Sequence, residues 1–296
     1  MNANVESLSS NYAIPGHLSF RETQSGLRVA DIQTSHASAS VALQGAQVLT
    51  WQPVGQQPVI WVSKAAIFAP GKPVRGGVPV CWPWFGPLGD KGAHGFVRTR
   101  AWQVRASQLD ATGEVVLRLG IGDDADTRAL WDQPFDLELV VTVGATLNMA
   151  LTSHNTGATP MAVTEALHTY FCVGNIAQTS VTGLDGCGYI DKVQNFSQHT
   201  QSGEVRFSGE TDRVYTPTSA ECVITDAAWG RNIHIAKQGS IATVVWNPWA
   251  EREKAFADMA AGEYQDMLCV ETANAPEPVT LAPGERHTLT AVISVR

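Results

Sequence analysis

The sequence predicts an all-β fold, a large antiparallel β-sandwich with a few short helices. First, apolar and polar residues alternate with a period of two along much of the chain, as in strands that bury one face. Second, Gly, Pro and Asn residues bound these short runs along the whole length. Third, helical periodicity is scarce, so long helices do not alternate with the strands as they do around a parallel sheet.

The clearest element is a hairpin within residues 135–157. Apolar residues occupy every second position from Leu137 to Val143, and the alternation resumes at Leu147 after a Gly-Ala turn. The hairpin therefore has one buried face. Further short β runs are expected at residues 25–33, 39–54, 57–63, 114–121, 221–228, 232–237, 241–249 and 286–296.

Helical candidates are limited to residues 124–131 and 250–260, each about two or three turns long. The chain has 296 residues, of which 44% are hydrophobic and 16% charged, so it can bury a full core. No linker, low-complexity tract or internal repeat divides it. We therefore expect residues 1–296 to form a single domain, with residues 1–14 loosely ordered.

Composition disfavours several classes of partner. The net charge of −8 argues against sequence-independent nucleic-acid binding, which needs a basic face. The chain has no apolar run of about 18 residues that could span a membrane, and its N-terminus lacks the pattern of a secretory signal. The five cysteines are scattered and never form a C-x-x-C pair, so we expect reduced thiols in a cytoplasmic protein. We also expect a monomer.

Residues 75–102 combine Arg75, His94 and Arg98 with many Gly, Pro and Trp residues. This combination favours a pocket for a flat-faced ligand that carries negative charge, because an arginine can hold a phosphate through two parallel hydrogen bonds. In an extended chain, His94 and Arg98 would share one face, and Gly76-Gly77 would let backbone approach a ligand closely. The alternative is a surface arginine in an exposed salt bridge.

The aromatic residues of this segment allow two interpretations. Trp82, Trp84 and Phe85, flanked by prolines, would form a stacking wall for a sugar, or they would pack in the core. The residues alone do not separate these two possibilities.

Two residues outside this segment are candidates for chemistry. Glu271 follows the apolar run Leu268–Val270, and burying an unpaired carboxylate is costly, so it is the strongest candidate on physical grounds. Burial would raise its pKa and make it a better base near neutral pH. His168 also lies in an apolar segment, where a lone histidine is more often a core residue. Asp212 would be a turn residue or a partner of the next residue, an arginine.

The chain contains, in this order, the six sequence blocks RGGVPVCWPWFG, HGFVR, ALHTYF, TDRVY, VVWNPW and MLCVETAN. This order resembles that of the hexose-6-phosphate mutarotases, or glucose-6-phosphate 1-epimerases, which are related to aldose 1-epimerase. From about residue 15 to the C-terminus, the chain resembles this family. The resemblance implies a β-sandwich of the galactose-mutarotase type, and interconversion of the α and β anomers of a hexose 6-phosphate, with glucose 6-phosphate the expected substrate.

The resemblance also implies a role for each site residue. His168 is implied as the general acid and Glu271 as the general base; the substrate-binding residues are implied to be Arg75, His94, Arg98, Asp212 and Trp82. The two arginines would bind the phosphate and Asp212 the sugar hydroxyls. One departure is visible: Ala93 stands where relatives often have a polar amide.

Anomer exchange needs one group to protonate the ring oxygen and another to deprotonate the anomeric hydroxyl. No electrons are exchanged, so the reaction requires no cofactor and no metal. Three alternatives remain: a mutarotase for a neutral aldose such as galactose, a non-catalytic carbohydrate-binding protein, and, less favoured, a glycoside hydrolase that uses Asp212 and Glu271.

Overall fold

A computed structural model describes residues 4–296, and in this part of the chain all paired strands of the three sheets are antiparallel. Sheet 1 follows the order of the sequence: β1 (Leu18–Glu22), β2 (Arg28–Gln33), β3 (Ala37–Ala42) and β4 (Gln47–Pro53). Sheet 2 has the order β14 (Ser197–Thr200), β13 (Gly188–Asp191), β16 (Thr211–Tyr215), β19 (Ala242–Asn247), β20 (Met267–Leu281), β10 (Met161–Leu167) and β5 (Val80–Cys81), and β11 (Tyr170–Cys172) also pairs with β20. Sheet 3 has the order β15 (Val205–Arg206), β12 (Thr179–Thr182), β17 (Cys222–Asp226), β18 (Arg231–Gln238), β21 (Arg286–Val295), β9 (Leu147–Asn155), β8 (Phe135–Val143), β7 (Val115–Gly122) and β6 (Gln103–Leu109).

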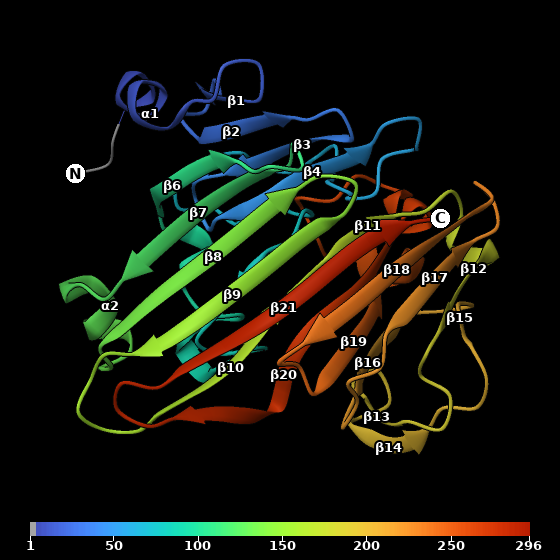
Figure 1. Cartoon of the computed structure of the whole chain (residues 1–296). Helices are drawn as coiled ribbons and strands as arrows, with labels where there is room; N and C mark the ends of the chain where they lie inside the picture. The colour runs from blue at the N-terminus through green and yellow to red at the C-terminus, as the bar shows by residue number, and fades with distance from the viewer. Residues whose placement is uncertain (1–3) are drawn as a thin grey trace.

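Sheets 2 and 3 pack face to face, with sheet 3 in front in the view of Figure 1. The main hydrophobic cluster contains Leu167 and Val270 from sheet 2 together with Leu139 and Leu151 from sheet 3, and all four are buried. A shared apolar layer between two antiparallel sheets defines a sandwich. The predicted all-β fold class is therefore confirmed.

Most of the predicted strands are present. The hairpin predicted in residues 135–157 is β8 and β9, whose residues alternate strictly between buried and half-buried. The runs at residues 25–33, 114–121, 221–228, 232–237, 241–249 and 286–296 coincide in large part with β2, β7, β17, β18, β19 and β21.

Two strand predictions need correction. Residues 39–54 form two strands, β3 and β4, because Gly45 turns the chain with a φ of 72°. Residues 57–63 were wrongly predicted as a strand. They make only isolated bridges, through Ile60 to Phe171 and through Val62 to Gly76.

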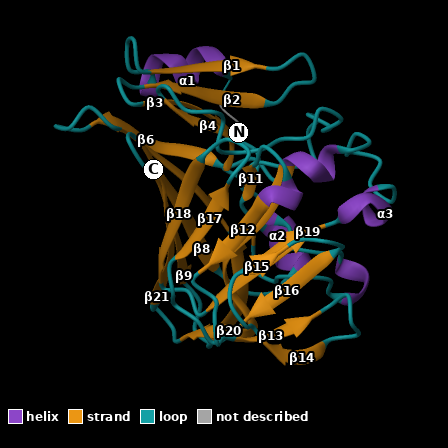
Figure 2. Ribbon diagram, turned by 90° about the vertical axis from the view of Figure 1, so that its right-hand side faces the viewer, coloured by secondary structure: helices purple, strands orange, loops and turns teal. Residues whose placement is uncertain are grey.

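Few helices accompany the sheets (Figure 2). The candidate at residues 124–131 is α2 (Ala125–Leu130), and the candidate at 250–260 is only α3 (Trp249–Glu253). Among the described residues, no helix has the length and apolar character that a membrane crossing requires.

One helix was not predicted. α1 (Val5–Tyr12) lies within residues 1–14, which were expected to be loosely ordered; residues 1–3 lie outside the described part. The Asn4 side chain caps this helix by accepting a hydrogen bond from the Ser7 amide, and only Leu8 is buried. A single buried residue leaves no apolar periodicity to detect, so packing of Leu8 rather than sequence pattern accounts for the helix.

The segment before Trp102 is folded rather than extended. His94 has a φ of 65°, Gly95 a φ of 66°, and Val97–Thr99 form a 3₁₀ helix. The prediction that His94 and Arg98 share a face of an extended chain was therefore wrong, because the chain between them is not extended. A Cβ at Gly95 would collide with the carbonyl of Trp82, so only glycine allows this close approach of two backbones.

Substituting Gly95 by alanine should lower stability more than the same change at Gly92. Both glycines have positive φ values, 66° and 82°, but a Cβ at Gly92 would meet no atom within 4 Å. Gly92→Ala should therefore cost only the backbone strain, about 1–3 kcal/mol. Gly95→Ala should cost about 1–3 kcal/mol more, from the collision. Urea unfolding of both variants measures the difference, and equal losses of stability would contradict the close approach.

Candidate active site

His168 and Glu271 meet because of how β10 pairs with β20. The last ladder pair on β10 is Leu167 opposite Thr272, so the next residue of β10 and the preceding residue of β20 face each other. The Nε2 atom of His168 lies 3.4 Å from Oε1 of Glu271. Residues far apart in the chain are thus brought into direct contact.

Each of these two side chains has an unpaired buried atom. The Glu271 side chain is 1% exposed and that of His168 12%. Nδ1 of His168 and Oε2 of Glu271 are buried without a hydrogen-bond partner among the described residues. Buried polar groups normally have partners. The two unpaired atoms lower stability where they lie, and such a cost at two adjacent titratable groups marks a candidate site.

The surroundings of His168 favour its neutral form. Burial lowers the pKa of His168 well below its ordinary value, and the nearby His94, Arg98 and Arg75 lower it further. An imidazolium ion would lose hydration and face like charges. A negatively charged ligand beside the arginines would weaken this repulsion.

The surroundings of Glu271 raise its pKa and so favour its protonated, neutral form. Burial raises the pKa of Glu271 well above its ordinary value; Lys192 opposes this effect and Asp212 adds to it. The neutral forms of both groups are favoured, so the His168–Glu271 pair retains one titratable proton near neutral pH. A group that holds a proton and a group that accepts one are what acid–base catalysis needs.

Arg75 is held in place from two sides. Its guanidinium lies 3.1 Å from Oδ1 of Asp258, donates to the Tyr170 hydroxyl at 3.3 Å, and stacks 4.5 Å from the Phe256 ring. These contacts orient a half-buried cation near His168, whose pKa it lowers. Asp258 and Phe256 were not predicted from the sequence, since they lie in an irregular segment without a motif.

Two further cations, Arg98 and Lys192, act electrostatically on the pair, Arg98 on His168 and Lys192 on Glu271. Arg98 donates to the carbonyl of Ala93 at 2.9 Å. Lys192 was not predicted; its ammonium lies 3.2 Å from Asp212 and 5.2 Å from the centre of the Phe85 ring. It directly follows β13 and no sequence motif marks it. The structure therefore adds a third cation to the two predicted arginines.

His94 lies beside His168, with 5.5 Å between the ring centres. Its Nδ1 accepts a hydrogen bond from the Gly86 amide at 3.4 Å, which leaves the proton on Nε2. Burial lowers the pKa of His94 to about 3, with help from Arg98, Lys192 and Arg75. A neutral imidazole here can donate one hydrogen bond to a sugar hydroxyl.

Trp82 was predicted to bind substrate, and the structure corrects this. Its side chain is fully buried, packs edge-on against Phe96 and Trp131, and donates from Nε1 to Ser153 at 3.0 Å. Trp84 is also buried. Of the three predicted wall residues, Phe85 alone lies beside His168.

Other rings surround His168 instead. Tyr170 stacks on it with 4.9 Å between ring centres and an angle of 10°. Trp246 meets both rings edge-on, 6.3 Å from His168 and 5.9 Å from Tyr170. Both residues belong to quoted sequence blocks, but their roles were not assigned there.

The paired glycines also act differently from the prediction. A Cβ at Gly76 would collide with backbone atoms of Trp61 and Val62, and one at Gly77 with the carbonyl of Val48. They allow segments of the protein, rather than a ligand, to approach closely. This packing holds the segment that carries Arg75.

The site contains one set of side chains that could hold a metal ion. Ligand atoms of His168, Cys269 and Glu271 lie within 4.8 Å of one another. Burial raises the pKa values of the Cys269 thiol and the Glu271 carboxyl, so both keep the protons that a metal would have to displace. The cations around the site also repel a divalent ion and favour an anion instead.

Comparison with known proteins agrees with the fold. The model of the aldose 1-epimerase family matches residues 28–294. An Escherichia coli (strain K12) protein named "Putative glucose-6-phosphate 1-epimerase" is 41% identical over 242 residues, 81% of this chain and 80% of that protein. The chain therefore belongs to the aldose 1-epimerase family.

Solved structures support the same assignment. A "putative mutarotase" from Salmonella typhimurium has a TM-score of 0.90 at 36% identity, covering 96% of this chain and 95% of that one. A galactose mutarotase related enzyme from Lactobacillus acidophilus has a TM-score of 0.71 at 12% identity, over 90% of this chain and 96% of that one. The latter likeness shows a fold of the galactose-mutarotase type.

Replacing Glu271 by glutamine should stabilise the protein increasingly as pH rises. Below the ordinary pKa of 4.5 the carboxyl is protonated in both folded and unfolded chains, so its ionisation costs nothing. Above this pH, the carboxyl ionises in the unfolded chain but stays neutral in the folded one. The wild-type protein therefore loses stability as pH rises towards the raised pKa of the folded state, whereas Glu271→Gln does not. The Tm of Glu271→Gln relative to wild type should therefore rise as pH increases above the ordinary pKa of 4.5.

The matched control is Glu253→Gln. Glu253 is also buried, but its carboxylate accepts backbone hydrogen bonds from Gly262 and Tyr264, each at 2.7 Å. This substitution should lower Tm at neutral pH, because it removes charge-assisted hydrogen bonds. A Tm difference for Glu271→Gln that does not change with pH would contradict the buried, unpaired carboxyl.

Proposed function

We propose that the protein interconverts the α and β anomers of a hexose 6-phosphate, with glucose 6-phosphate the preferred substrate. The contact between His168 and Glu271 carries this proposal: an acid and a base 3.4 Å apart, each with an unpaired buried atom. The neighbouring cations Arg75, Arg98 and Lys192 support a phosphorylated substrate. Relatives named for the same reaction support it further.

In the proposed reaction Glu271, as the carboxylate, takes the proton of the anomeric hydroxyl, and His168, as the imidazolium, donates its proton to the ring oxygen. The bond between C1 and the ring oxygen breaks, and the C1 carbonyl forms. C1 turns about its bond to C2. On closure from the other face, the C5 hydroxyl gives its proton to His168 and Glu271 gives its proton to the former carbonyl oxygen, so the pair ends with the proton it began with.

The phosphate has two roles in this proposal. Held by Arg75 and Arg98, it fixes one end of the sugar while C1 moves, which lowers the entropic part of the barrier. Its negative charge also offsets the cations that lower the pKa of His168, and so favours the imidazolium that the first step uses. Asp212 and His94 would bind sugar hydroxyls.

We also propose that residues 1–296 act as one domain, as a monomer in the cytoplasm, without metal or cofactor. The main hydrophobic cluster supports one domain, since it includes residues from Leu8 to Ile293. The five cysteines are free in the structure, as expected in a reducing compartment.

Exchange NMR on glucose 6-phosphate anomers, and on free glucose, tests the substrate. Glucose 6-phosphate should exchange with a kcat/KM about 100-fold higher, since charged hydrogen bonds contribute about 1.5–3 kcal/mol each. Arg98→Gln should reduce this preference and leave exchange of free glucose nearly unchanged. Faster turnover of the free sugar would overturn the phosphate assignment in favour of a neutral aldose.

Variants of the pair separate catalysis from binding. His168→Ala and Glu271→Gln should each lower kcat by about 10²–10⁴-fold, because each removes a proton-transfer group. Calorimetric binding of glucose 6-phosphate should change little, since the arginines remain. A wild-type protein that binds the sugar phosphate without turnover, and variants that alter only affinity, would instead establish a carbohydrate-binding protein.

A further inference from the structure

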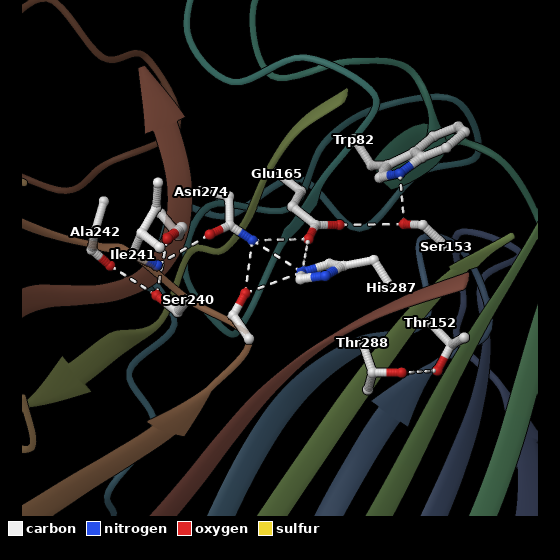
Figure 3. A network of polar contacts seen from close by, with 12 residues as sticks. Trp82, Thr152, Ser153, Glu165, Ser240, Ile241, Ala242, Asn274, His287 and Thr288 are labelled. Carbon is white, nitrogen blue, oxygen red and sulfur yellow. Dashed lines mark hydrogen bonds and ion pairs between the residues drawn. The ribbon is translucent and has the colours of Figure 1, made fainter. Parts of the chain in front are cut away.

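A second buried carboxylate lies on β10, three residues before His168. Glu165 is fully buried, and its Oε1 accepts a hydrogen bond from Asn274 of β20 at 3.1 Å. Its Oε2 accepts from Ser153 of β9 at 3.1 Å, and Nε2 of His287 on β21 lies 3.2 Å from Oε1 (Figure 3). This carboxylate, unlike Glu271, has a partner for each oxygen.

The Glu165–Asn274 pair lies where the pairing of β10 with β20 changes. Val163 is opposite Val279, and Glu165 is opposite Asn274, so β10 advances two residues while β20 advances five. β20 therefore holds three extra residues at this bulge. The ladder that continues past Glu165 ends at Leu167, directly before His168.

The pair and the acid–base site lie on opposite faces of sheet 2. Glu165 shares a face with Leu167, which belongs to the cluster between the sheets, and it contacts Ser153 of sheet 3. Glu271 lies two residues from Ala273, which belongs to a separate small cluster on the other face. Glu165 is thus too remote to touch a substrate bound at His168.

We propose that Glu165 and Asn274 are positioning residues: their hydrogen bond sets the register of β10 on β20 that places His168 against Glu271. This role rests on the function proposed above. If the short ladder slipped, Glu165 would lose the Asn274 amide and leave a buried carboxylate underpaired, which is costly. The extra residues of the bulge would allow the register of the two strands to shift, and the hydrogen bond between Glu165 and Asn274 prevents this shift.

Asn274 is itself fixed by the turn between β18 and β19. Its amide nitrogen donates to the carbonyl of Gly239 at 2.8 Å, and its oxygen accepts from the Ile241 amide at 3.0 Å. Ser240 donates to the carbonyl of Ala273 at 2.8 Å. The pair therefore anchors β10 to a part of β20 that is already held.

Two variants of equal length at Glu165 test the proposal. Glu165→Gln keeps an oxygen that can accept from Asn274, and should retain kcat within about threefold. Glu165→Met fills the same space without that hydrogen bond, and should lower kcat about 10–100-fold with KM changed less than about threefold, because a small misplacement of catalytic groups slows the chemistry. Because Glu165→Met leaves the side chains of Asn274, Ser153 and His287 without their partner, its Tm should fall as well.

The control is Val141→Ala, a buried residue of β8 in sheet 3. It should lower Tm without lowering kcat of the folded enzyme. If Glu165→Met retains kcat as Glu165→Gln does, or loses only Tm as the control does, the positioning role is wrong. If Glu165→Met does not fold, Asn274→Leu removes the same hydrogen bond from the β20 side.

A second readout does not depend on the proposed function. The imidazole ¹H–¹⁵N signals of His168, assigned by their loss in His168→Ala, report its contact with Glu271 without any substrate. They should shift in Glu165→Met and stay unchanged in Glu165→Gln and Val141→Ala. A wild-type protein inactive on glucose 6-phosphate would reject the proposed function, and unshifted His168 signals would reject the positioning role.

Discussion

The pairing of β10 with β20 is the constraint on which the site depends. An antiparallel ladder fixes which residues face each other, and here it ends so that His168 and Glu271 meet, with 3.4 Å between Nε2 and Oε1. The two residues are far apart in the sequence, so only the strand pairing brings them into contact. The cations and aromatic rings of the site are arranged around this contact.

The buried carboxylates of the protein differ in how they are satisfied. Glu165, Glu253 and Glu263 accept hydrogen bonds at both oxygens, from side chains or backbone amides. Glu271 keeps an oxygen without a partner, and its neighbour His168 keeps a nitrogen without one. Leaving buried polar atoms unpaired lowers stability. Such a cost at a pair of titratable groups is characteristic of a site built for a ligand.

Sequence reasoning predicted the burial of Glu271, whose chemistry is unusual in its surroundings, and failed where packing decides. Glu271 was a candidate from the sequence alone, because a carboxylate within an apolar strand is unusual. Trp82 carried the same aromatic signal as a pocket wall, yet it fills the core, because a tryptophan in a Pro-rich segment suits either place. Lys192 has no local signal, since only the turn after β13 brings its ammonium to Asp212.

The alternation of apolar residues by itself determined the sandwich, because a period of two can bury only one face of a strand and two such faces must meet. It also determined most strands, and the quoted blocks predicted which residues serve as the acid, the base and the two substrate-binding arginines. Tertiary structure alone decided the bulge between β10 and β20, the close packing of Gly76 and Gly95 against backbone, and the rings around His168. These depend on contacts between residues distant in the chain, which no local pattern specifies.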